Sequence, residues 1–183
     1  MGDPEKGVVL KIGPNVVGLP KWFINENDNF VKVDLSEATK LTTFAEYTFY
    51  GSKKLEEVIL GSALTALPNY AIYNCQELKK CDLPDNIKTL GNYAFASNYA
   101  LPEIDLNQVT SIGTYCFSAC YSLQKVYYSK AMTTIPNYVF YQCYGLKEIE
   151  FFTDITAINQ YSFAYCYNLR SFKIPDTVTS IGN

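Results

Sequence analysis

The chain has 183 residues and a formal net charge of −3, from 15 Lys and Arg against 18 Asp and Glu. Hydrophobic residues make up 48% and charged residues 18%, which is typical of a folded domain and unlike a disordered tail. The sequence contains no basic stripe or run of Lys and Arg, so we expect no nucleic-acid partner. No stretch approaches 18 consecutive apolar residues, so we expect no membrane insertion by this segment.

One pattern of apolar residues recurs about every 23 positions from Val16 to the end of the chain. Each unit has spaced apolar residues, an aromatic residue, Phe or Ile, then Cys, Asn or Ser, and ends in a Leu-x-x-Val-x-Leu strand signature. A period of roughly 20–29 residues with one such segment predicts a leucine-rich repeat solenoid, in which each unit forms one coil and stacking buries the core. The seven units begin at Val16, Leu41, Leu64, Ile87, Val109, Met132 and Ile155.

The two ends of the chain fit the same register. Residues 1–7 are too polar for the apolar core of a signal peptide. Leu10 and Ile12 stand where the last two strand positions of an earlier coil would fall. We therefore expect residues 1–15 to be the N-terminal remnant of an earlier coil or cap, and residues 16–183 to be a solenoid truncated at the start of an eighth coil. Any leader or anchor would then lie outside this chain.

The predicted fold class is an α/β repeat, a solenoid of about seven 23-residue coils with one parallel β-strand each. Neighbouring strands about 4.8 Å apart would form one sheet roughly 30 Å wide. Opposite the sheet, residues at three-residue intervals, such as Phe117, Cys120 and Leu123, predict 3₁₀ or short helical turns. The predicted strands cover residues 32–35, 57–60, 80–83, 103–106, 125–128, 148–151 and 171–174.

A specific motif recurs within the units. It combines Ile-Gly with Phe, a Cys three residues after the Phe, and a Leu three residues after the Cys. The segment Val-Thr-Ser-Ile-Gly begins at Val109 and again at Val178. In the fifth unit the motif consists of Ile112, Gly113, Cys116, Phe117, Cys120 and Leu123.

This motif resembles the BspA-like family of leucine-rich repeats, and the resemblance covers residues 10–183. It implies a surface or secreted protein of anaerobic bacteria or protist parasites, in which repeat arrays mediate adhesion to host or partner surfaces. The implied function is a noncatalytic module, at the cell surface or secreted, that binds a protein or glycan on another surface. Two alternatives stay open: a passive spacer or stalk, and an intracellular scaffold that joins protein partners.

The sequence offers little for catalysis. It has no His, which is the commonest general base and the usual partner of a Ser or Cys nucleophile. Asp82 and Asp105 hold the same outward strand position in adjacent coils, about 5 Å apart, which invites comparison with retaining glycosidases. An open sheet face lacks the cleft that such an enzyme needs. We expect no enzyme, no cofactor and no metal; a weak cation bridged by the two Asp beside Glu103 is the alternative.

Four of the six cysteines share one repeat position and should stack as buried free thiols. Parallel Cβ vectors in adjacent coils make the disulfide torsion awkward. Zinc usually needs paired Cys or nearby His, and only Cys116 and Cys120 have such spacing. The predicted column consists of Cys75, Cys120, Cys143 and Cys166.

Outward strand positions alternate in charge, which places opposite charges on neighbouring strands. Such a ladder fixes repeat register and contributes roughly tenths of a kcal/mol per exposed pair, while a ligand role is the alternative. The alternating residues are Lys32, Glu57, Lys80, Glu103, Lys125 and Glu148.

The last coils relax this alternation and present mixed aromatic and charged side chains on the strand face. We predict a partner-binding patch here. Its candidate residues are Tyr127, Glu150, Phe152 and Lys173.

Aromatic residues fall into two columns. The first shares one position of the apolar register and predicts a stacked structural ladder: Trp22, Tyr47, Tyr70, Tyr93, Tyr115, Tyr138 and Tyr161. The second directly follows the Cys position, so its rings should be partly exposed and are candidates for partner binding. Self-stacking that stiffens the solenoid is the alternative. The second column consists of Tyr99, Tyr121, Tyr144 and Tyr167.

Overall fold

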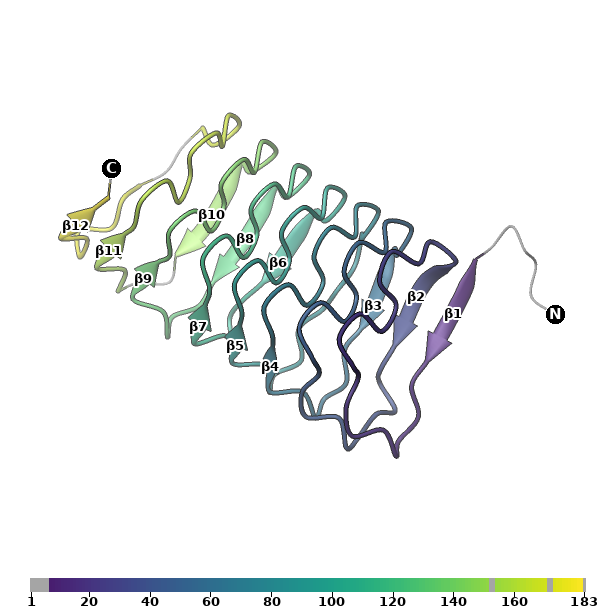
Figure 1. Ribbon diagram of the computed structural model, residues 1–183. Helices are drawn as coiled ribbons and strands as arrows, with labels where there is room; N and C mark the ends of the chain where they lie inside the picture. The colour runs from purple at the N-terminus through teal and green to yellow at the C-terminus, as the bar shows by residue number, and fades with distance from the viewer. Residues whose placement is uncertain (1–6, 152–153, 171–172, 183) are drawn as a thin grey trace.

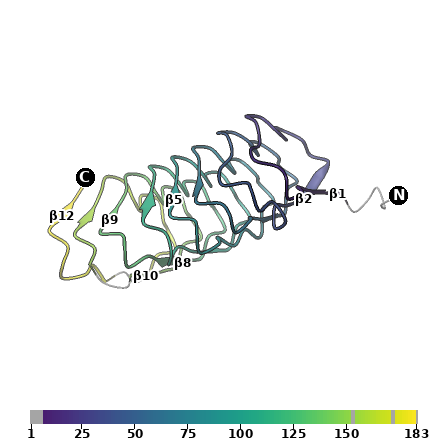
Figure 2. The same cartoon turned by 90° about the horizontal axis from the view of Figure 1, so that it is seen from below.

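The computed structural model describes residues 7–151, 154–170 and 173–182. The chain winds into a stack of similar coils, with its two termini at opposite ends of the stack (Figures 1 and 2). Longer strands form one row along the stack and short strands form a second row (Figure 1). The predicted solenoid of stacked coils with parallel strands is therefore confirmed.

The row of longer strands contains two parallel sheets of three strands each, in the orders β1-β2-β3 and β6-β8-β10. Residues one repeat apart are paired, as in Lys32 with Glu57 and Glu148 with Lys125. We call the outward side of this row the strand face. Its strands are β1 (Val8–Lys11), β2 (Phe30–Asp34), β3 (Glu57–Ile59), β6 (Glu103–Asp105), β8 (Lys125–Tyr128) and β10 (Glu148–Phe151).

The prediction of one continuous sheet is wrong. The segment 80–83 forms no strand and contributes a single bridge between Glu57 and Lys80, so the row divides between β3 and β6. The predicted strand at 171–174 lies partly outside the described residues, and no strand is formed by the described pair 173–174.

The second row of strands was not predicted. Each of its strands has only two residues, and together they form two further parallel sheets, in the orders β4-β5-β7 and β9-β11-β12. The strands are β4 (Ala66–Leu67), β5 (Thr89–Leu90), β7 (Ser111–Ile112), β9 (Thr134–Ile135), β11 (Ala157–Ile158) and β12 (Ser180–Ile181).

The predicted helical turns are also wrong, because the described residues contain no α-helix and no 3₁₀-helix. Tyr115 and Ala119 have φ of 57° and 56°, and a right-handed helix does not continue through left-handed residues. Single turns form at these residues: the Ser118 N–H donates to the Tyr115 carbonyl at 3.0 Å, and the Cys120 N–H donates to the Phe117 carbonyl at 3.3 Å. The Phe117 N–H instead donates to the Val139 carbonyl of the next coil at 3.0 Å, so this side of the stack is also hydrogen bonded from coil to coil.

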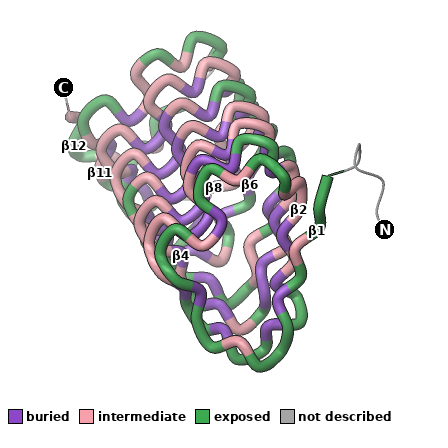
Figure 3. The backbone as a smooth tube through the Cα atoms, turned by 45° about the vertical axis from the view of Figure 1, so that its right-hand side comes forward, coloured by how far each residue is buried: buried purple, intermediate pink, exposed green. Residues whose placement is uncertain are grey.

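The buried residues are mostly hydrophobic and form one core cluster. Buried and exposed segments alternate along the backbone of each coil (Figure 3). Phe95, Phe117 and Phe140 are fully buried and stack at centroid distances of 5.4 and 5.8 Å. Burying a side chain of this size contributes about 1.5–3 kcal/mol. The column joins neighbouring coils, so each coil is stabilised mainly by the coils on either side of it.

The predicted column of free thiols is confirmed, since all six cysteines are free, but of the four named ones, which share one repeat position, only Cys75, Cys120 and Cys143 are buried and Cys166 is half-buried. Each of these four thiols contacts a carbonyl of the preceding coil, as Cys120 Sγ does at 3.2 Å from Phe95 O. Asn98 takes this position in the fourth coil. Its amide donates to the Ile72 carbonyl at 2.9 Å and accepts the Cys75 N–H at 2.8 Å. From the third coil to the seventh, one polar group at this position thus satisfies backbone groups of the preceding coil.

We predict that Asn98→Ala lowers the free energy of unfolding by about 2–5 kcal/mol, because it creates a cavity and leaves two buried backbone groups unpaired. Asn98→Cys is the matched control. Its thiol can donate to the Ile72 carbonyl as Cys120 does to Phe95, so it should lose markedly less stability. Urea unfolding of both variants provides the measurement, and equal losses would contradict the role given to the Ile72 hydrogen bond.

The left-handed residues generate a second prediction. Ala119→Gly should raise the free energy of unfolding by about 1 kcal/mol, because Gly adopts a positive φ without the Cβ clash that an L-residue meets. Ala94 lies outside this conformation, so Ala94→Gly should lower the same quantity. Thermal or urea unfolding compares the two, and a loss of stability in Ala119→Gly would refute the assignment of strain to this position.

Candidate binding surfaces

The candidate residues of the strand face are brought together on β8 and β10. Lys125 Nζ lies 2.7 Å from Glu150 Oε1 and 4.6 Å from the centroid of the Tyr127 ring. Glu148 lies farther from the same ammonium, at 3.8 Å. The hydrogen bond to Glu150 is the main reason that the pKa of Lys125 is raised above its ordinary value. We call Lys125, Tyr127 and Glu150 the cationic cluster; it combines both charges with an aromatic face.

The structure describes only one of the other two candidates of this face. Lys173 is exposed, and Phe152 lies outside the described residues. The sequence predicts Lys125 only as part of the alternating charge ladder. Its place in the cationic cluster follows from the strand register, which pairs Tyr127 with Glu150.

The alternating charges on the strand face form ion pairs in part: Lys32, Glu57, Lys80, Lys125 and Glu148 are paired, whereas Glu103 forms no ion pair among the described residues. Lys32 Nζ lies 2.6 Å from Glu57 Oε2, and Lys80 Nζ lies 3.7 Å from the other oxygen of the same carboxylate. These side chains are partly exposed, so each pair contributes about 0–1 kcal/mol. The ladder therefore favours the correct register more than it stabilises the fold.

The second tyrosine column forms a continuous stack. Tyr99 and Tyr121 lie 4.5 Å apart, Tyr121 and Tyr144 4.9 Å, and Tyr144 and Tyr167 5.5 Å, with interplanar angles of 8–11°. Tyr121 is 36% exposed and Tyr167 is 74% exposed. The inner rings cover each other's faces, so they present edges and hydroxyl groups to solvent, whereas Tyr167 is open.

The first aromatic column forms the predicted ladder, with centroid distances of 4.3–5.0 Å from Trp22 to Tyr161. All seven residues of this column have a positive φ, which the sequence did not reveal. A left-handed L-residue costs about 1–2 kcal/mol, and an aromatic pair contributes about 0.5–1.5 kcal/mol beyond its burial. Stacking thus offsets much of the strain, which supports a structural role for this column.

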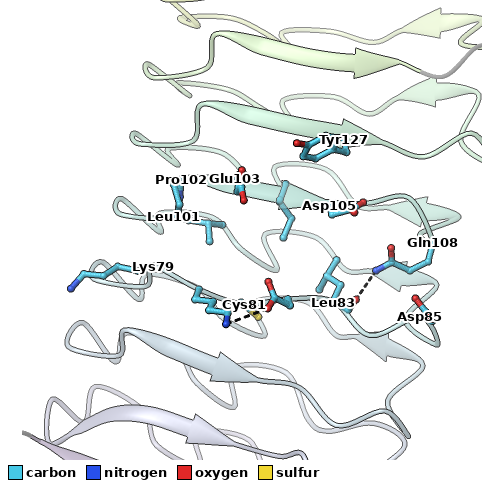
Figure 4. Close-up of a pocket in the computed structure, with 13 residues that line it drawn as sticks. Lys79, Cys81, Leu83, Asp85, Leu101, Pro102, Glu103, Asp105, Gln108 and Tyr127 are labelled. Atoms are coloured by element: carbon cyan, nitrogen blue, oxygen red, sulfur yellow. Dashed lines mark hydrogen bonds and ion pairs between the residues drawn. The ribbon is translucent and has the colours of Figure 1, made fainter.

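A hollow of about 500 Å³ lies on the strand face between the third and fourth coils (Figure 4). Asp82, Glu103 and Asp105 all line it, together with Tyr127 of the cationic cluster. The expected pairing of Asp82 with Asp105 on adjacent strands is wrong, because the segment 80–83 does not pair with β6. The described residues contain no group of three or more His, Cys, Asp or Glu that could hold a metal ion.

Two residues of the hollow were missed by the sequence reasoning. The Gln108 side-chain amide donates to the Leu83 carbonyl at 2.9 Å, and Pro102 stands at the start of β6 (Figure 4). The signal for Pro102 was readable, since Lys79 and Gln124 hold its position in the adjacent coils. Both residues shape the gap between the coils.

Stacked parallel coils of about 23 residues, with Leu, Phe or Ile, and Cys, Asn or Ser recurring at the same positions, define a solenoid of the leucine-rich repeat class. The BspA type leucine rich repeat region matches residues 20–143 and 101–183, in six copies. The chain belongs to this family of BspA-type leucine-rich repeats. A comparison with curated proteins finds no match. Within the described part of the chain, no helix is long and apolar enough to cross a membrane.

Several solved structures share the fold. A leucine-rich repeat protein from Bacteroides ovatus is 25% identical with a TM-score of 0.90; the match covers 96% of this chain and 48% of that protein. The T. pallidum leucine rich repeat protein is 21% identical with a TM-score of 0.75, covering 97% and 74%. The pneumococcal vaccine antigen PcpA is 17% identical with a TM-score of 0.55, covering 83% and 36%. The chain thus spans about half the length of the Bacteroides ovatus protein.

The buried thiols generate a prediction about pH. Burial raises the pKa of Cys75 and Cys120 from 9.0 to about 12. Unfolded thiols release their protons from about pH 9 upward while the native thiols keep theirs, so the free energy of unfolding should fall from about pH 9 to 12. Cys120→Ala should lessen this slope by up to about 1.4 kcal/mol per pH unit.

Urea unfolding of both proteins at several pH values between 8 and 11 measures the two slopes. Tyrosines also titrate in this range, but they are the same in both proteins and cancel in the comparison. Identical slopes would show that Cys120 is not protected from ionisation in the folded chain.

Proposed function

We propose that this chain is a noncatalytic module of a cell-surface or secreted protein, and that it adheres to a protein on another surface. Membership of the BspA-type repeat family supports a binding module without catalysis. The similarity to a pneumococcal vaccine antigen is consistent with an extracellular location. The stack of coils presents side chains from successive repeats as one continuous surface.

The cationic cluster is the observation that carries this proposal. Lys125 is held by Glu150 and by the Tyr127 ring, and all three side chains rise from paired strands. Such a cluster is ordered before a partner arrives, so binding loses little side-chain freedom. Tyr also brings a large contact area and a hydroxyl group, and it is enriched in protein interfaces.

A protein partner fits the second tyrosine column better than a glycan does. A sugar ring stacks on an open aromatic face, and both faces of Tyr121 and Tyr144 are covered by neighbouring rings, while Tyr99 stacks on Tyr121 with one face. Edges and hydroxyl groups suit the polar contacts of a protein interface. Tyr167, at 74% exposed, is the ring of this column with a face open to either partner.

We predict that Tyr127→Ser combined with Glu150→Gln weakens binding at least tenfold, because it removes both groups that hold Lys125. Surface plasmon resonance against purified extracellular proteins, run beside a glycan array, measures this effect. Glu77→Gln is the matched control, since Glu77 forms an exposed ion pair with Lys54 elsewhere on the surface. Circular dichroism establishes that each variant is folded.

A second variant changes the tyrosine column to Ser at all four positions. Binding that is lost only in this variant would move the site from the strand face to the column. If the unchanged chain binds neither the purified extracellular proteins nor the glycan array, the adhesion proposal is refuted and a passive spacer is favoured. The four positions are Tyr99, Tyr121, Tyr144 and Tyr167.

A further inference from the structure

Backbone hydrogen bonds join most neighbouring coils along the strand face in the same way. The residue before each strand position of the repeat donates its N–H to the previous coil: Lys79 to the Glu56 carbonyl at 2.8 Å, and Gln124 to the Pro102 carbonyl at 2.7 Å. A strand residue donates to the next coil, as Val58 does to the Lys80 carbonyl at 3.0 Å. Together these bonds form a regular hydrogen-bond ladder along the strand face.

The ladder is interrupted between the third and fourth coils. In the described structure no backbone hydrogen bond joins residues 79–83 to residues 102–106. Cys81 and Glu103 stand one coil after Val58 and Lys80, yet the Cys81 N–H does not donate to the Glu103 carbonyl. A Gln108 side chain donating to Leu83 takes the place of the backbone contacts at one end of the gap.

Pro102 accounts for the interruption. It stands where Lys79 and Gln124 donate an N–H to the previous coil, and proline has no N–H to donate. The opening is local, because the same two coils stay joined on their other sides by hydrogen bonds from the Ala100 N–H to the Gln76 carbonyl and from the Lys88 N–H to the Thr65 carbonyl, at 3.1 and 2.9 Å.

The interruption leaves β6 as the edge of a sheet within the stack. In the order β10-β8-β6, one side of β6 pairs with β8 and the other faces the hollow. A free strand edge carries a row of N–H and carbonyl groups that can pair with an added chain. The hollow of about 500 Å³ lies within the range of ligand pockets, roughly 300–1,000 Å³, and it is open to solvent.

The charge of the hollow specifies what can enter. Asp82, Asp85, Glu103 and Asp105 line it against two cations, Lys79 and Lys80. Asp82 is 85% exposed, and its ion pair with Lys80 is long, at 3.7 Å. The Tyr127 ring adds an aromatic wall on the side of β8 (Figure 4). Carboxylates beside an aromatic ring favour a Lys or Arg side chain.

We propose that the gap between the third and fourth coils binds an extended segment of a partner protein, which adds as a strand to the free edge of β6 and places a Lys or Arg among the carboxylates. The backbone supplies hydrogen bonds and the carboxylates supply selectivity, as in other cases of strand addition. This inference rests on the proposed protein-binding function and specifies the chemistry of the partner segment.

The probe is the peptide Thr-Arg-Val-Arg-Thr-amide with fluorescein attached to its N-terminal amine, and its binding is followed by fluorescence anisotropy. A peptide with Glu in place of Arg tests the charge requirement. A third peptide, N-methylated at alternate backbone nitrogens, keeps the charge but loses the ladder donors on one edge. We expect saturable binding of the first peptide and at least tenfold weaker binding of the other two.

Two variants of the protein test the site itself. Pro102→Gln restores the donor that Gln124 provides in the next coil, so it should close the ladder and weaken peptide binding at least tenfold. Asp105→Asn removes a carboxylate of the hollow, keeps the side-chain oxygen that accepts the Asn107 N–H at 2.8 Å, and should weaken binding several-fold. Asp154→Asn, at an exposed site elsewhere, is the matched control and should leave binding unchanged.

The fold of Pro102→Gln is checked by backbone NMR spectra, in which the Cys81 and Glu103 amides should gain protection from hydrogen exchange. Equal binding of the N-methylated and unmodified peptides would overturn strand addition. So would unchanged peptide binding by Pro102→Gln if its Cys81 and Glu103 amides are protected from hydrogen exchange. Partner binding that survives in Pro102→Gln but is lost with Tyr127→Ser and Glu150→Gln would sink this inference and leave the proposed function standing.

Discussion

The hydrogen bond from one coil to the next is the constraint on which the rest of the structure depends. Each coil donates backbone N–H groups to its neighbour on several sides of the stack, as Phe117 does to Val139 and Val58 does to Lys80. Because these bonds align residues one repeat apart, equivalent side chains are stacked into columns. The buried Phe residues, the inward thiols and both tyrosine ladders all follow from this alignment.

The same constraint explains why strained backbone recurs instead of being removed. Tyr115 and Ala119 have positive φ, and each donates its N–H to the next coil, at 3.2 and 2.7 Å. A left-handed residue turns the chain so that alternate N–H groups point along the stack. The strain of about 1–2 kcal/mol per residue is therefore offset by hydrogen bonds and ring stacking between coils.

Much of the fold could be predicted from the repeat, because residues of the same type at one repeat position show which positions are equivalent in every coil. It located the strands at Glu57, Glu103, Lys125 and Glu148, the thiol column and both aromatic columns. Two-residue strands such as Ser111–Ile112 have no alternation to read. The three-residue spacing of Phe, Cys and Leu fits helical turns and also turns interrupted by left-handed residues. The binding cluster was found only in part, since Tyr127 and Glu150 carried a signal while the link through Lys125 needed the strand register.

The hollow could not be predicted from the regular repeat pattern. The sequence placed Asp82 and Asp105 at equivalent positions, and a perfect repeat would pair them as neighbours on one sheet. Pro102 breaks that expectation by removing one donor, and the sheet divides at that coil. In an array whose coils satisfy one another, the interface between the third and fourth coils leaves one side of β6 without backbone hydrogen bonds in the described structure, so this side has hydrogen bonds to offer another chain. Specific recognition in such a protein therefore arises where the repeat is least regular.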